Sequence, residues 1–148
     1  MRALFYKLIY TEIPEDFMIR VGMMNPMFMP RIRDNLLKSF ENAKVFRFLH
    51  IPVQSGSNVV LNDMKRGHTV ETFKNVVSKF RTKFGSFTTS TDIIIGYPTE
   101  TQENFEETIE LLKETTPEVV NISRYSRRPG TVAAEMPQID VAEVKRRS

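Results

Sequence analysis

The chain has 148 residues, of which 41% are hydrophobic and 26% are charged, values that fit one globular domain with a core of its own. It contains no run of about 18 apolar residues, so we expect no membrane span. The absence of cysteine excludes disulfides, thiolate metal sites and cysteine nucleophiles within the chain. A net charge of +3 and a pI of about 9.3 are compatible with an RNA partner, and the cytoplasm is the expected compartment.

Apolar runs alternate with amphipathic stretches. Met1–Asp16 is interpreted as the tail of a helix. The predicted strands are Met18–Met23, Val45–Val53, Phe87–Ile95 and Val119–Tyr125. Helices are predicted after Pro30, from a Ser57 cap to Gly67, after a Thr69 cap, after a Thr99–Gln102 capping box, and over Val141–Arg147.

This order of elements predicts an α/β fold with parallel strands and right-handed crossovers. Ile93–Ile95 and Val119–Ile122 are almost uniformly apolar, which favours strands that are covered on both faces. A closed barrel needs eight βα units and about 250 residues. We therefore expect residues 1–148 to form a single domain with two open sheet edges. Such a domain either continues in a longer protein or pairs with a second copy as a homodimer.

Each predicted strand ends in a small polar loop that contains Gly or Pro. The loops are Asn25-Pro26, Gln54–Ser57, Gly96–Glu100 and Tyr125–Gly130. Parallel strands bring such loops to one edge of a sheet. Gly56 and Gly96 allow a ligand to approach the backbone closely, and Gln54, Ser55 and Ser57 offer donors and acceptors for hydroxyls or an amino-acid head group. One loop alone is better explained as an ordinary turn, but the recurrence favours a site for a small polar ligand.

Four segments carry a specific resemblance: HIPVQSGS at 50–57, MKRGHT at 64–69, TDIIIGYPTET at 91–101 and YSRRPGTVAAEM at 125–136. In this order and spacing the sequence resembles the radical S-adenosylmethionine (SAM) methylthiotransferases. RVGMMNP at 20–26 is similar to the branch of archaea and eukaryotes that acts on threonylcarbamoyladenosine in tRNA. The resemblance covers roughly residues 19–147.

The resemblance implies a parallel-stranded partial TIM-type barrel, of which the chain would hold about four βα units of a radical SAM core. Members of the family bind 4Fe-4S clusters through cysteines and cleave SAM to a deoxyadenosyl radical. They install a methylthio group at C2 of a modified adenosine next to the anticodon of tRNA. Thiolates hold such clusters, and this chain has none. We therefore expect no metal site and no catalytic residue here, and no activity from this chain alone.

The resemblance also implies a partial SAM site. The residues expected there are Gln54, Ser55, Gly56, Ser57, Arg66, Ile94, Gly96, Tyr97 and Tyr125. Arg66 would meet the methionine carboxylate, and Gly96 and Tyr97 would line the adenine side. Arg127 and Arg128 are expected near the cofactor or the RNA. Thr99 replaces a glycine that is usual in the family, and it suits a helix cap.

Other readings of the sequence remain open. A non-catalytic module would bind RNA through Arg124, Arg127, Arg128 and Lys145–Arg147, although these side chains equally fit a solvated surface. A self-associating unit would pair its open edges, and a different four-stranded ligand binder is a third possibility. His50 is expected to be a hydrogen-bonded strand residue rather than a metal ligand. Asp92 is expected to pair with Arg20, Arg47 or Arg124.

Overall fold

The computed structural model describes residues 17–148, so the helix expected within Met1–Asp16 lies outside the described part. In chain order the elements are the 3-10 helix η1 (Pro26–Phe28), α2 (Met29–Ser39), β1 (Phe48–His50), α3 (Asn58–Asp63), α4 (Val70–Phe84), β2 (Thr88–Ile95), α5 (Gln102–Thr115), β3 (Val119–Arg124), α6 (Val132–Glu135) and α7 (Val141–Arg147). No helix within the described residues is long and apolar enough to cross a bilayer.

The sheet is parallel, with the strand order β1-β2-β3. The predicted α/β class is therefore confirmed, but the sheet of the described residues has three strands rather than four. The expected strand Met18–Met23 makes only an isolated bridge from Ile19 to Val45. The N–H of Phe48 donates to the carbonyl of Phe46 at 2.8 Å, and this tight turn interrupts the ladder before Met24 meets His50 again.

β1 is also shorter than the predicted strand Val45–Val53. Pro52 has no N–H to donate, so the regular ladder cannot continue through it. The hydroxyl of Thr91 bridges the gap by donating to the carbonyl of Ile51 at 3.0 Å and accepting the N–H of Val53 at 3.1 Å. Beyond the gap, Gln54 pairs with β2 again through an isolated bridge to Ile93. The chain thus follows β2 as far as the predicted loop.

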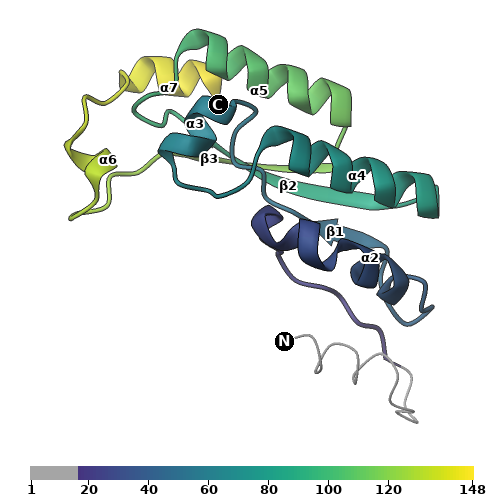
Figure 1. Ribbon diagram of the computed structural model, residues 1–148. Coiled ribbons are helices and arrows are strands. Elements are labelled where there is room, and N and C mark those ends of the chain that lie inside the picture. The colour runs from purple at the N-terminus through teal and green to yellow at the C-terminus, as the bar shows by residue number, and fades with distance from the viewer. Residues whose placement is uncertain (1–16) are drawn as a thin grey trace.

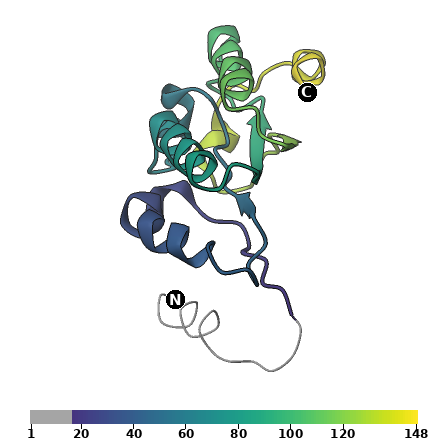
Figure 2. The same ribbon diagram turned by 90° about the vertical axis from the view of Figure 1, so that its right-hand side faces the viewer.

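Helices α4 and α5 lie along one face of the sheet (Figures 1 and 2). Their side of β2 carries buried residues at alternate positions: Thr89, Thr91, Ile93 and Ile95. Where the strands begin, four phenylalanines form an aromatic cluster with ring centroids 5.1–6.4 Å apart: Phe40, Phe80, Phe84 and Phe87. Each such ring pair contributes about 0.5–1.5 kcal/mol beyond the burial of its area.

The expectation that Val119–Ile122 is covered on both faces is wrong within the described residues. Val119 is 39% exposed and Ile122 is 51% exposed. β3 is an edge strand of this sheet and pairs only with β2. Its apolar run therefore lacks the neighbouring strand and helix that would bury it.

Three of the predicted helix signals have different outcomes. Thr69 caps α4 as predicted by accepting the N–H of Thr72. The cap of α5 is Thr101 rather than Thr99, because Thr101 and Asn104 form a reciprocal capping box. Helix α3 ends at Asp63, four residues before Gly67, because Lys65 already adopts a left-handed backbone with φ of 54°.

Candidate ligand site at the carboxyl ends of the strands

The loops that follow β1, β2 and β3 lie side by side. The carbonyl of Gln54 accepts the N–H of Ile94 at 2.9 Å, and the carbonyl of Ile95 accepts the N–H of Tyr125 at 2.8 Å. Helices α3, α6 and α7 surround this end of the sheet (Figure 1). Ile94 lies half-buried in β2 beside the first loop. The backbone therefore brings the loops at Gln54, Gly96 and Tyr125 together.

A polar cluster connects these loops. Arg66 Nη2 donates to Gln54 Oε1 at 3.2 Å, and the ring of Tyr97 lies edge-on to that of Tyr125 with centroids 5.4 Å apart. The Tyr97 hydroxyl donates to the carbonyl of Asp63 at 3.1 Å. Within residues 17–148, Arg66 Nε and the hydroxyl of Tyr125 are buried without a hydrogen-bond partner. Such orphaned groups cost about 1–3 kcal/mol each, and they mark where a ligand or water would bind.

The electrostatics of this cluster favour an acidic group on the ligand. Burial lowers the pKa of Arg66, and the nearby charge of Arg128 lowers it further. Burial likewise raises the pKa of Tyr97, so its hydroxyl remains neutral at physiological pH. A partly desolvated guanidinium gains most from a carboxylate or phosphate partner.

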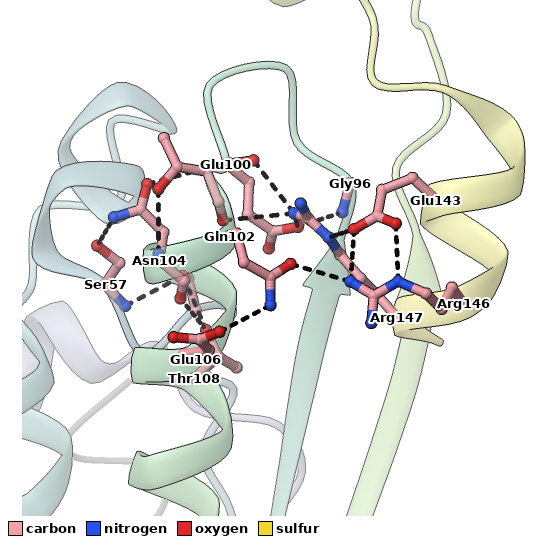
Figure 3. Close-up of polar contacts among 12 residues, drawn as sticks. Ser57, Gly96, Glu100, Gln102, Asn104, Glu106, Thr108, Glu143, Arg146 and Arg147 are labelled. Atoms are coloured by element: carbon pink, nitrogen blue, oxygen red, sulfur yellow. Dashed lines mark hydrogen bonds and ion pairs between the residues drawn. The ribbon is translucent and has the colours of Figure 1, made fainter.

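The remaining residues of the first loop face the other way. The N–H of Gly56 donates to Thr108 Oγ1 at 2.9 Å, and Ser55 Oγ lies 3.4 Å from the same hydroxyl. Ser57 Oγ accepts from the Asn104 side chain at 2.9 Å (Figure 3). Ser55, Gly56 and Ser57 thus fix the loop to α5, and the structure does not bring their side chains to the Arg66 cluster.

A hollow of about 360 Å³ opens between β3 and α7. Its lining residues are Gly96, Arg124, Tyr125, Arg127, Gln138, Ile139, Val141, Val144 and Lys145. Gly96 adopts a left-handed backbone with φ of +81°, a conformation that glycine tolerates without strain. Three residues predicted from the loops, Gly96, Tyr125 and Arg127, therefore share this hollow.

The sequence of the chain matches the Radical SAM superfamily over residues 2–112. The chain belongs to the radical SAM superfamily. It is 53% identical over 129 residues to a "Probable threonylcarbamoyladenosine tRNA methylthiotransferase" of Archaeoglobus fulgidus, a match that covers 87% of this chain and 30% of the relative. It is 41% identical over 146 residues to the human threonylcarbamoyladenosine tRNA methylthiotransferase, which covers 99% of this chain and 25% of that protein. The resemblance inferred from the motifs is thereby confirmed, and the chain spans less than a third of these relatives' length.

The donors of this radical SAM chain fit SAM but not an iron–sulfur cluster. The orphaned Arg66 and Tyr125 atoms, together with the Gly96 turn, offer contacts for a charged and polar small molecule. The chain has no cysteine, and its described residues contain no group of His, Asp or Glu arranged to hold a metal. Cluster ligands are therefore not supplied by this chain.

The expected arginine partner of Asp92 is wrong. Its carboxylate lies 3.0 Å from His50 Nε2 and accepts from the Asn121 side chain at 2.8 Å. The register between β2 and β3 places Asn121 directly opposite Asp92, which the sequence could not indicate. Arg20 lies instead over the ring of Phe48.

Sequence reasoning also missed the role of Arg147, which it assigned to a solvated surface or to RNA phosphate. The Arg147 side chain is 6% exposed and pairs with Glu100, whose side chain is fully buried. Glu100 in turn accepts the N–H of Gly96 (Figure 3). The one available signal was the i, i+4 spacing of Glu143 and Arg147 on α7, a pairing that the structure contains.

Proposed function

We propose that this chain forms part of the SAM-binding wall of a protein that installs a methylthio group on a modified adenosine of tRNA. The observation that carries the proposal is the pair of orphaned buried atoms, Arg66 Nε and the Tyr125 hydroxyl, at the ends of adjacent parallel strands. The names of the relatives support the choice of reaction and of tRNA as substrate. The three-stranded sheet is, on this proposal, a part of a partial TIM-type barrel.

Each residue of the cluster has a separate task in this proposal. Arg66 binds the methionine carboxylate, and Gln54 orients Arg66 through their hydrogen bond. Tyr125 donates its hydroxyl to the ligand, while the backbone at Gly96 and the ring of Tyr97 border the adenine. When bound beside a reduced cluster, SAM supplies a deoxyadenosyl radical. Because the chain offers no thiolate, that cluster is held by other residues of the protein, and the chain alone is inactive.

The proposal is tested by titrating the isotope-labelled chain with S-adenosylhomocysteine and following its amide resonances. We expect shifts at Gln54, Arg66, Gly96, Tyr97 and Tyr125. Arg66→Met should abolish them, because the carboxylate would lose its charged partner.

Lys65→Met is the matched control, since it removes the neighbouring exposed charge at an unchanged left-handed backbone. Shifts confined to residues outside the cluster would overturn the proposal. Equal binding by Arg66→Met and Lys65→Met would reject the role of Arg66.

A non-catalytic RNA-binding module is the second candidate, favoured by the basic residues around the hollow. Arg124, Arg127 and Lys145 line it together. This alternative expects RNA binding that weakens steeply with salt and does not respond to S-adenosylhomocysteine. A fluorescence anisotropy titration with a short anticodon stem-loop, with and without S-adenosylhomocysteine, separates the two functions.

A further inference from the structure

We propose that Arg147 and Glu100 are positioning residues of the ligand site, which hold α7 against the Gly96 turn. The inference rests on the proposed function for the identity of the ligand. It assigns a role in the site to the last helix, which none of the sequence motifs includes. Figure 3 shows the contacts that carry it.

Glu100 is a buried carboxylate at the turn between β2 and α5. Its Oε2 atom accepts the N–H of Gly96 at 2.9 Å and a hydrogen bond from Arg147 Nη1 at 3.0 Å. Its Oε1 atom is buried without a partner among the described residues. A buried carboxylate is tolerated only when it is paired, so Glu100 depends on Arg147.

Arg147 is held on several sides. Nη1 also donates to the carbonyl of Glu100 at 3.2 Å, and Nε donates to Glu143 at 2.7 Å. The guanidinium carbon lies 5.4 Å from the ring centre of Phe105 on α5. These contacts leave the guanidinium engaged within the protein rather than directed at a nucleic acid.

The ion pair has a direct consequence at the hollow. Val144 lies one helical turn before Arg147, and a Cβ atom at Gly96 would come within 2.7 Å of its side chain. α7 therefore closes one wall of the hollow through Val144, opposite Tyr125. Loss of Arg147 would leave Glu100 unpaired and release both the Gly96 turn and this wall.

Arg146 provides an internal contrast on the same helix. It also binds Glu143, but its side chain is 58% exposed and its other partner is Gln102 on the surface of α5. Exposed pairs contribute little. Arg146→Met is therefore a matched control for Arg147→Met.

The test measures S-adenosylhomocysteine affinity by calorimetry and Gly96 amide exchange by NMR in the two variants. We expect Arg147→Met to weaken affinity about tenfold or more, because it strands a buried charge beside the site. Arg146→Met should stay within about twofold of the unsubstituted chain. In Arg147→Met the Gly96 amide should exchange faster, while core amides such as that of Phe80 keep their protection. Unchanged Gly96 exchange, or equal affinities of the two variants, would overturn the proposal.

The unsubstituted chain provides a second test if Arg147→Met does not fold. S-adenosylhomocysteine should slow amide exchange at Val144 and Gly96 together, and unchanged exchange at Val144 despite binding would overturn the positioning role. Absence of any binding would instead reject the proposed function. The coupling of Gly96 to α7 would then be judged from Gly96 exchange in the conservative variant Arg147→Lys, which retains the charge but not the multiple donors.

Discussion

Gly56 is the point at which the first ligand loop touches α5, and its replacement should be costly. A Cβ atom built at Gly56 would lie 2.4 Å from Thr108 Cα and 2.5 Å from the carbonyl oxygen of Glu107. Ordinary contact begins at 3.4 Å, so the loop and α5 would have to separate by about 1 Å. Both colliding groups belong to the helix backbone, which cannot move aside as a flexible side chain would.

We expect Gly56→Ala to lower the free energy of unfolding by about 3–4 kcal/mol. Overpacking costs about 1–3 kcal/mol, and weakening the bond from the Gly56 N–H to Thr108 adds about 1 kcal/mol. Urea unfolding followed by circular dichroism measures the difference. Gly22→Ala is the control, since no atom lies within 4 Å of a Cβ at that position, and it should change stability by less than about 0.5 kcal/mol. A Gly56→Ala chain within 1 kcal/mol of the unsubstituted chain would refute this reasoning.

Three further outcomes are expected. Thr101→Ala should cost about 1 kcal/mol in urea unfolding through loss of its cap, whereas Thr99→Val should be neutral or stabilising, because the Thr99 hydroxyl is buried without a partner in the described structure; a reversed order would restore Thr99 as the cap. Hydrogen bonds from Arg146 and then Arg147 lower the pKa of Glu143 from 4.5 to about 2. The stability that this carboxylate contributes is therefore complete above about pH 4.5 and lost as the pH falls toward 2; a carbon-detected NMR titration checks this, and Arg146→Met should raise the pKa. Phe80→Ala should cost about 3–5 kcal/mol in the same unfolding assay, and a loss below 1 kcal/mol would contradict a rigid aromatic cluster.

The sequence predicted those elements whose local signals agree with their tertiary surroundings. The Thr69 cap and the stripe of Phe73, Val76, Val77 and Phe80 specify α4, and the structure buries that stripe. The loops at strand ends were predictable because parallel strands carry their carboxyl ends to one edge.

The errors fall where long-range pairing decides. Two threonines compete to cap α5, and the outcome depends on Asn104 and on Glu100 being needed in the interior. The partner of Asp92 follows from strand register, which alternation alone does not fix. The burial of Arg147 depends on where α7 docks, and a basic residue near a chain end carries no local sign of that.

The aromatic cluster of Phe40, Phe80, Phe84 and Phe87 lies at the amino ends of the strands, while the hollow beside Gly96 lies at their carboxyl ends. Resistance to melting and recognition of a small molecule are thus assigned to opposite poles of one sheet. Directed evolution of the carboxyl-end loops should therefore shift ligand preference at little cost in melting temperature. Temperature-sensitive alleles should instead accumulate among the phenylalanines, with unaltered affinity below their transition.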